Sequence, residues 1–171
     1  MRTDDFFATF TRTAWRLETL PAYGTPDSDP SFAAYLELGH LPPLEDRPPK
    51  QAWMAAVRQA VAEGRQLGRV HVVRRPLTPY LDYELATYPE NVEAGEDIRI
   101  ADADQHPELA TLSTDFWLLD NERVLVMAYD DDGRFINAMP TTNPTVVPAC
   151  RRFRDLAIAC SVPLQEFLQP V

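Results

Sequence analysis

The spacing of apolar residues along the 171-residue chain predicts a mixture of strands and helices. Residues 14–19 alternate between apolar and charged side chains, which indicates a half-exposed strand, and the β-branched run 70–73 indicates a buried one. An Asp-Asp-Asp-Gly sequence at 130–133 predicts a hairpin turn. The other predicted strands cover residues 96–101, 115–119, 123–129 and 134–139.

Helices are predicted where apolar residues recur three or four apart between proline or capping residues and glycine stops. Asp4 or Asp5 is expected to cap a helix that runs to about Arg12, with Phe6, Phe7 and Phe10 on one face, as core or as partner anchors. Residues 89–95 are expected to form a loop. The other predicted helices cover residues 30–38, 49–63, 76–87 and 145–160, and a short helix follows Pro163.

These elements predict an α/β (α+β) fold with a mixed, largely antiparallel sheet flanked by helices. Prolines cluster between residues 40 and 49, so residues 40–48 are predicted to be a linker. Residues 1–39 are then an N-terminal arm or subdomain, and residues 49–171 form the main domain.

Charge is unevenly distributed along a chain whose net charge is −10. Residues 49–81 hold six basic and one acidic residue, whereas residues 82–132 hold two basic and 15 acidic residues. The acidic excess argues against non-specific binding to phosphate backbones and favours a protein partner or a cationic ligand. Mutual neutralisation of the two segments within the fold is the alternative.

The ends and the cysteines predict a cytoplasmic protein. Acidic residues precede any apolar run, and no stretch is long enough for a signal-peptide core or a membrane span. Cys150 and Cys160 are therefore expected to be reduced thiols that act as small buried hydrophobes.

Recognisable catalytic and metal-binding motifs are absent from the sequence. His40, His71 and His106 form no metal-binding pair, and His71 is expected to lie in a buried strand with its ring hydrogen-bonded. Asp130–Asp132 lack the spacing of a calcium loop. No nucleophile or phosphate-loop motif occurs, so no cofactor, metal site or catalytic residue is expected, and an enzymatic role is left open.

The densest group of polar and aromatic residues lies between positions 74 and 99. It is interpreted either as an arginine–glutamate network that ties helix to sheet or as a binding site. Its candidate binding residues are Arg74, Arg75, Tyr80, Tyr83, Glu84, Tyr88, Asn91, Glu96 and Arg99.

Several of these segments resemble an actinobacterial, Streptomyces-type family of unknown function. The segments are Trp15–Glu18, Arg74–Leu85, Asn91–Arg99, Asp115–Asp120 and the tail from Cys150 to Leu168. The resemblance covers nearly the whole chain. It implies a small cytoplasmic protein of a kind often encoded near helix-turn-helix regulators, and it implies no established activity.

A weaker resemblance relates residues 70–139 to the phospholipase D-like fold. Hydrolases of that fold carry a His-x-Lys-x₄-Asp motif, but here Val73 occupies the lysine position after His71. The resemblance therefore implies a fold without its hydrolytic site.

The sequence leads to two functional hypotheses of different classes. The first is a non-enzymatic accessory to a transcriptional regulator, such as a helix-turn-helix protein, which acts through protein–protein contact. The alternative is a small-molecule sensor or enzyme with a pocket built from Arg74, Tyr83, Glu84, Glu96 and Arg99. Direct binding to nucleic acid or membrane is not expected, and the oligomeric state is left open.

Overall fold

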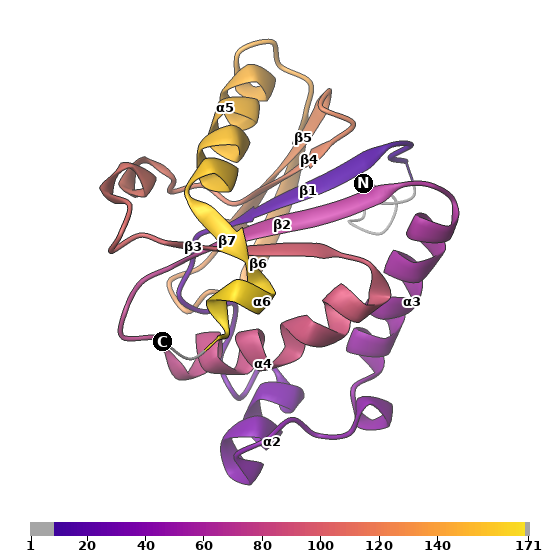
Figure 1. The fold of residues 1–171 in the computed structure, drawn as a ribbon, viewed down its shortest axis with the longest axis vertical. Coiled ribbons are helices and arrows are strands. Elements are labelled where there is room, and N and C mark those ends of the chain that lie inside the picture. The colour runs from indigo at the N-terminus through magenta and orange to yellow at the C-terminus, as the bar shows by residue number, and fades with distance from the viewer. Residues whose placement is uncertain (1–8, 170–171) are drawn as a thin grey trace.

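The computed structural model describes residues 9–169, which form one mixed sheet with helices on both faces (Figure 1). The strands are β1 (Thr13–Glu18), β2 (Gln66–Val73), β3 (Asp97–Asp102), β4 (Phe116–Leu119), β5 (Arg123–Tyr129), β6 (Phe135–Thr141) and β7 (Ser161–Pro163). The helices are α2 (Pro30–Leu38), α3 (Pro48–Ala62), α4 (Pro79–Ala94), α5 (Val146–Ala159) and α6 (Leu164–Phe167), with 3₁₀ turns η1 (Leu44–Asp46) and η2 (Pro107–Thr111).

The seven strands follow the order β6-β5-β4-β1-β2-β3-β7. β1, β2 and β3 run parallel, while the pairs β1–β4, β4–β5, β5–β6 and β3–β7 are antiparallel. This arrangement confirms the predicted fold class, a mixed and largely antiparallel sheet flanked by helices.

Helices cover both faces of the sheet at β1–β4, so most residues of these strands are buried, whereas β6 has no buried residue. Met54 and Val57 of α3 pack with Ala14 of β1 on one face, where α4 also lies. Val147 and Cys150 of α5 pack with Leu17 and its neighbours on the other face. Because successive residues of a strand point to opposite faces, both helix layers contact the same central strands.

The N-terminal segment belongs to this sheet, which corrects the prediction of an arm or subdomain over residues 1–39. β1 lies between β2 and β4, with Leu17 paired to Val70 in one direction and to Phe116 in the other. A central strand cannot be removed without opening the sheet, so the described residues of the two predicted parts, 9–39 and 49–169, share one core.

The predicted linker also packs against the body of the protein. Arg47 is 3% exposed, and its Nη1 donates to Glu90 Oε2 of α4 at 2.8 Å.

The helix predicted from Asp4 to about Arg12 can be compared with the structure only from residue 9 onward. Residues 1–8, which include Phe6 and Phe7, lie outside the described residues. Residues 9–12 form a turn and bend rather than a helix, with Phe10 buried.

Helix α4 is longer than predicted, because it continues through Pro89 to Ala94 instead of ending in a loop. Pro89 removes one backbone hydrogen bond, but Tyr88, Asn91 and Ala94 are buried on the inner face of this last part. Strand β7 is absent from the sequence-based prediction, since three residues carry too little pattern to be recognised.

Other expectations are confirmed by the structure. Cys150 and Cys160 are free and buried, and burial raises the pKa of the Cys150 thiol to about 11. His71 is fully buried in β2, and a turn at residues 130–134 joins β5 to β6. No helix in the described part of the chain combines the length and apolar character needed to cross a bilayer.

Candidate functional site

Four polar side chains from β1 and β2 project from the same face of the sheet, beneath α4. Arg16 lies opposite Arg69 and Glu18 lies opposite His71 in the parallel register. All four are at least nine-tenths buried. The strand over residues 14–19 is therefore not half-exposed as predicted, because helices cover both of its faces. Buried charges of this kind are costly unless they are paired.

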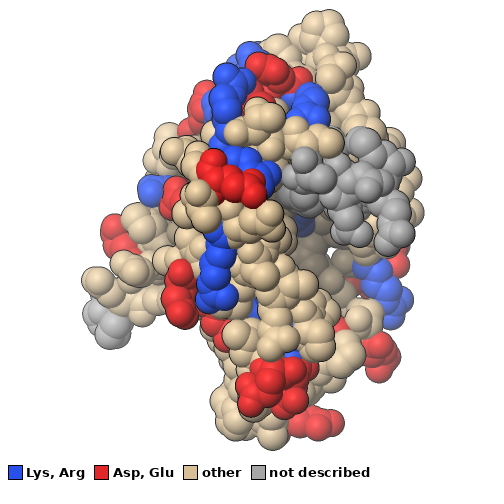
Figure 2. Space-filling view, turned by 90° about the vertical axis from the view of Figure 1, so that its right-hand side faces the viewer, with Lys and Arg blue, Asp and Glu red and all other residues tan. Residues whose placement is uncertain are grey.

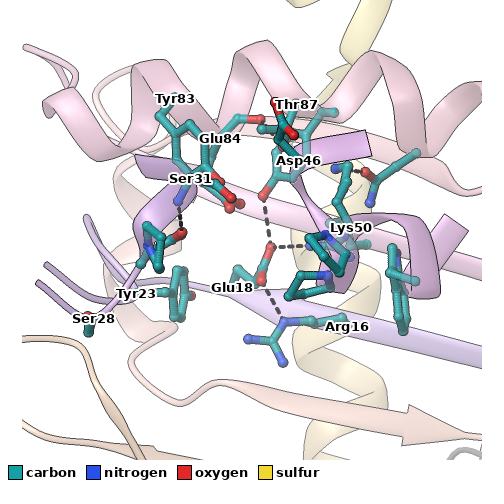
Figure 3. Close-up of a pocket in the computed structure, with 18 of the residues that line it drawn as sticks. Arg16, Glu18, Tyr23, Ser28, Ser31, Asp46, Lys50, Tyr83, Glu84 and Thr87 are labelled. Atoms are coloured by element: carbon teal, nitrogen blue, oxygen red, sulfur yellow. Dashed lines mark hydrogen bonds and ion pairs between the residues drawn. The ribbon is translucent and has the colours of Figure 1, made fainter. Parts of the chain in front are cut away.

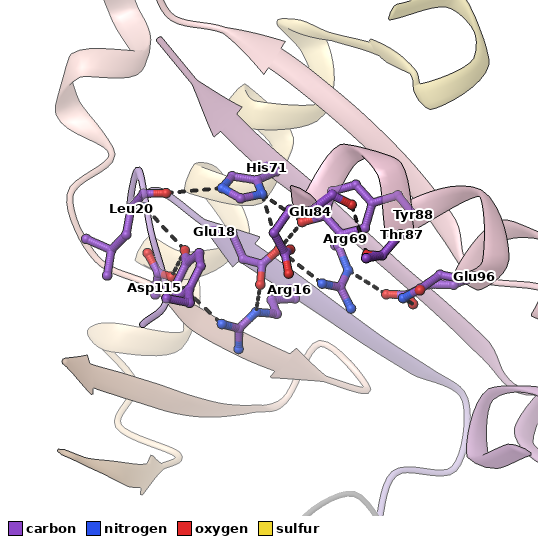
Figure 4. Close-up of polar contacts among 12 residues, drawn as sticks. Arg16, Glu18, Leu20, Arg69, His71, Glu84, Thr87, Tyr88, Glu96 and Asp115 are labelled. Carbon is purple, nitrogen blue, oxygen red and sulfur yellow. Dashed lines mark hydrogen bonds and ion pairs between the residues drawn. The ribbon is translucent and has the colours of Figure 1, made fainter. Parts of the chain in front are cut away.

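The two arginines are held by carboxylates in a continuous series, the buried ion-pair chain Arg16–Glu18–Arg69–Glu96 (Figure 4). Arg16 Nε lies 2.6 Å from Glu18 Oε1, Arg69 Nη1 lies 3.1 Å from Glu18 Oε2, and Arg69 Nε lies 2.6 Å from Glu96 Oε1. Burial disfavours the charged form of Glu18, but Arg69 and Arg16 outweigh it and hold the pKa of Glu18 well below its usual range. Glu18 is thus a fixed anion between two fixed cations.

Glu96 is the last member at one end of the ion-pair chain and has no accessible side-chain surface. Its Oε2 accepts hydrogen bonds from Trp53 Nε1 at 3.0 Å and from Asn91 Nδ2 at 2.7 Å. Because α3 and α4 supply these two donors, the network fixes both helices to the sheet.

Asp115 lies at the other end of the ion-pair chain, next to Arg16. It accepts from Thr19 Oγ1 at 2.7 Å and from the Tyr23 hydroxyl, and it lies 3.9 Å from Arg16 Nη2. Burial raises the pKa of Asp115, although Arg16 partly offsets this effect. Arg16 Nη2 also donates to the Tyr129 hydroxyl at 2.7 Å.

His71 lies beside the ion-pair chain rather than within it. Its Nδ1 is 2.7 Å from the Tyr88 hydroxyl, its Nε2 is 3.2 Å from the Leu20 carbonyl, and Tyr88 in turn contacts Glu18 Oε2 at 3.0 Å. A carbonyl can only accept, so Nε2 carries a proton. Tyr88 has a single hydroxyl proton and lies between His71 Nδ1 and Glu18 Oε2, so it links the histidine to the ion-pair chain.

A cavity of about 630 Å³ lies above the two arginines (Figure 3). We call it the arginine cavity; α2, α3 and α4 form its walls over the β1–β2 floor. Volumes between about 300 and 1,000 Å³ are typical of small-molecule sites. Its aromatic lining consists of Tyr23, Trp53, Tyr83, Tyr88 and Trp117.

Each floor arginine retains hydrogen-bonding capacity. Among the residues that the structure describes, neither Arg16 Nη1 nor Arg69 Nη2 has a hydrogen-bond partner, although both side chains line the cavity. Lys50 adds a third cation from α3, and burial lowers its pKa to about 8 even though Glu84 and Glu90 raise it. The cavity can therefore offer several N–H donors to one anionic group.

A metal ion is a poor match for this floor. Ligand atoms of Glu18, His71 and Glu84 lie within 4.8 Å of one another. Both Glu18 oxygens, however, are already bound to arginine, and a further cation would face two guanidinium groups. The unused guanidinium donors of the floor favour an anion, whereas the carboxylates of Asp29, Asp46 and Glu84, which also line the cavity, do not.

The structure brings together only some of the predicted site residues. Tyr83, Glu84, Tyr88 and Asn91 line the cavity, Glu96 ends the ion-pair chain, and Tyr80 packs behind the wall with its hydroxyl 3.3 Å from Glu84.

The three predicted arginines lie elsewhere. Arg74 is exposed, Arg75 pairs with Asp102 at 3.2 Å, and Arg99 bonds to Ser161 from the opposite face of β3. The predicted pocket of Arg74, Tyr83, Glu84, Glu96 and Arg99 is therefore only partly assembled. Tyr83, Glu84 and Glu96 lie at or next to the cavity, whereas Arg74 and Arg99 do not line it.

Sequence reasoning missed the floor of the site. Arg16, Glu18 and Arg69 alternate with apolar residues and resemble solvent-facing positions of a half-exposed strand. A signal was present in the basic residues of β1 and β2, but only the strand register brings them together.

Comparison with known proteins adds a family and a fold. A family model described as a domain of unknown function (DUF6879) matches residues 1–169. No curated protein matches the chain. Among solved structures, the chain is similar to Nuc from Salmonella typhimurium, described as a phospholipase D family member. The TM-score is 0.52 at 10% identity, covering 92% of this chain and 84% of that one, so this likeness concerns the fold alone.

Proposed function

The chain belongs to the family described as a domain of unknown function (DUF6879), and we propose that it binds a small polar molecule carrying an anionic group in the arginine cavity. The observation that carries this proposal is the pair of buried arginines, each with an unused guanidinium nitrogen among the described residues, beneath a cavity of about 630 Å³. A network that only stabilised the fold would need neither the cavity nor the unused donors.

The lining defines the class of ligand. Carboxylates and phosphates accept paired hydrogen bonds from guanidinium groups. The five aromatic side chains would contact a flat or apolar portion of the same molecule. An aromatic or heterocyclic carboxylate or phosphomonoester meets both requirements.

Binding fits the cavity better than histidine-based hydrolysis of a phosphodiester. His71 is fully buried, is bonded to Tyr88 and Leu20, and does not line the cavity. Val73 also stands where the hydrolase motif has lysine. The likeness to a phospholipase D family member therefore concerns the scaffold and does not support a hydrolytic activity for this chain.

A thermal-shift panel of aromatic carboxylates and phosphomonoesters, followed by calorimetric titration of the hits, tests the proposal. Lys50→Met should weaken binding about ten-fold or more, since a charge-assisted hydrogen bond contributes about 1.5–3 kcal/mol. Arg58→Met is the matched control, because Arg58 is exposed on the same helix and outside the cavity. Equal weakening in both variants, or a panel without hits, would contradict the proposal.

The pH dependence provides a second readout. Lys50 is protonated below its pKa of about 8 and neutral above it. Affinity for an anion should therefore be full below pH 8 and fall as the pH rises through that value. The fall should disappear in Lys50→Met and persist in Arg58→Met.

A second candidate, contact with a protein partner, is favoured by the open edge strand β6. Phe135, Ile136 and Met139 are 50%, 60% and 51% exposed. The acidic turn Asp130–Asp132 adjoins them, so a basic partner with apolar side chains fits this edge. Such a partner would be a helix-turn-helix regulator for which this protein acts as an accessory.

Charge elsewhere on the surface is less directional. On the face that carries α3, acidic and basic side chains are interleaved (Figure 2).

Binding to a purified basic helix-turn-helix protein tests the β6 edge. The affinity should fall about ten-fold in the double variant Ile136→Ser/Met139→Ser. It should be unchanged in Leu38→Ser, because Leu38 is similarly exposed but lies on α2. An equal fall in affinity in Leu38→Ser would contradict the assignment of β6 as the docking edge.

A further inference from the structure

A second group of reactive side chains lies outside the arginine cavity, where η2 meets the end of α5. His106 and Glu108 flank Pro107 at the start of η2, and Cys160 follows the last residue of α5. One ligand atom from each residue lies within 4.8 Å of the other two. A thiol, an imidazole and a carboxylate thus converge from two distant parts of the sequence.

The distances among these atoms match the edges of a metal tetrahedron. Cys160 Sγ lies 3.4 Å from Glu108 Oε1, and His106 Nδ1 lies 3.5 Å from the same oxygen. Zinc bonds of about 2.0–2.3 Å at tetrahedral angles place neighbouring ligand atoms about 3.3–3.6 Å apart. Both distances fall in this range, and small side-chain rotations would bring the three atoms onto one ion.

The arrangement does not suit a cysteine nucleophile. Catalytic cysteines are activated by a neighbouring histidine, whereas here the Cys160 thiol contacts the carboxylate of Glu108. The histidine also contacts that carboxylate, so Glu108 is the central member. A carboxylate beside a thiol disfavours the reactive thiolate unless a cation joins them.

We propose that His106, Glu108 and Cys160 form a binding site for a zinc-type divalent metal ion. Sulfur and nitrogen ligands select borderline ions such as Zn²⁺ over Ca²⁺ or Mg²⁺, which require oxygen ligands. The side chains of His106 and Glu108 are 38% and 51% exposed, so an ion can enter and a solvent ligand can complete its coordination. The ligand set resembles open zinc sites, which keep three protein ligands.

The backbone around the site is already ordered. His106 N donates to the Asp102 carbonyl at 3.1 Å, and Leu109 N donates to the His106 carbonyl at 3.0 Å. On the other side, Cys160 N donates to the Leu156 carbonyl at 3.1 Å. An ion would therefore tie the β3–β4 connection to the α5–β7 junction without refolding either.

The test uses the full chain without an affinity tag, stripped with a chelator and titrated with Zn²⁺ against a competing chelator. Co²⁺ titration adds a spectroscopic readout, because a thiolate-to-cobalt charge-transfer band reports sulfur ligation directly. We expect one ion per chain, the cobalt band, and an affinity at least about 100-fold weaker in Cys160→Ser and in His106→Ala. Since His106 is partly exposed, its variant should remain folded even if the cysteine variant does not.

Cys150→Ser and His40→Ala are the matched controls. Cys150 is another buried free thiol on α5, and His40 is exposed in the segment after α2. Both should bind Zn²⁺ like the unmodified chain. Absence of stoichiometric binding, loss of the cobalt band in Cys150→Ser, or full affinity in His106→Ala would overturn the site. None of these outcomes bears on the arginine cavity.

Discussion

Arg16 and Arg69 lie side by side in the interior because Glu18 stands between them. Adjacent like charges on paired strands repel each other, and burial magnifies that cost. Glu18 binds one arginine with each oxygen, and Glu96 binds Arg69 a second time. The ion-pair chain is thus neutral enough to be buried and still leaves guanidinium donors for the cavity.

Removing one member of the ion-pair chain should lower the free energy of unfolding of the protein. Arg69→Met leaves Glu18 with one guanidinium partner instead of two and Glu96 with none, and breaking a buried ion pair costs about 3–5 kcal/mol. The free energy of unfolding, measured by urea denaturation, should fall by about that amount. Arg99→Met, which loses hydrogen bonds to Ser161 on the other face, should cost less than half as much.

If Arg69→Met proved as stable as the unmodified chain, the charges would not be coupled as the structure indicates. A loss equal to that of Arg99→Met would instead mark the ion-pair chain as ordinary polar packing.

The part of this site that α4 contributes is predictable from local sequence, because residues four apart on a helix share a face. Tyr80, Glu84 and Tyr88 are four residues apart, so helical periodicity alone places them together. Arg16 and Arg69 are separated by more than 50 residues, and only the β1–β2 register brings them opposite each other. Because a parallel register depends on the intervening helices, no local pattern in β1 or β2 reveals it.

At the level of elements, most helices are predictable with nearly correct limits, whereas their connections are not. The capping pattern Asp29-Pro30 marks the start of α2, and the apolar spacing of α5 marks its full length. Pro89 locally indicates the end of α4, although burial of Tyr88 and Asn91 extends the helix past it. The linker prediction fails for a similar reason, since Arg47 makes a tertiary ion pair that local composition does not show.

The β5–β6 turn is an element whose position depends on one glycine. Gly133 has a φ of +75°, and a Cβ at this position would lie 2.2 Å from the Ala22 carbonyl oxygen. The turn therefore touches the loop that carries Tyr23, which lines the cavity. Close approach of the two backbones helps to hold that wall of the cavity in place.

Gly133→Ala should destabilise the fold by more than about 2 kcal/mol, because it adds a backbone clash to the left-handed strain of about 1–2 kcal/mol. Gly64→Ala is the matched control: its φ is +79°, and a Cβ there would meet no atom within 4 Å, so it should show the strain alone. Thermal and urea unfolding of both variants measure the difference. Equal losses of stability in the two variants would mean that the turn does not closely contact the loop that carries Tyr23.

On the scale of the whole molecule, the sheet places charge chemistry at the boundary between its two halves. The parallel strands β1 and β2 carry the arginines, and the antiparallel strands β4 and β5 supply Trp117 and Tyr129 beside them. The helical wall closes over this boundary, so the cavity exists only in the assembled fold. Ligand binding should therefore stabilise the whole domain rather than one segment.

A crystal structure of the protein with the tightest-binding compound from the anion panel tests the central claim most directly. The account predicts the anionic group within hydrogen-bonding distance of Arg16 Nη1 and Arg69 Nη2, with the remainder of the molecule against the aromatic walls. A compound bound elsewhere, with the arginine cavity occupied only by solvent, would contradict it.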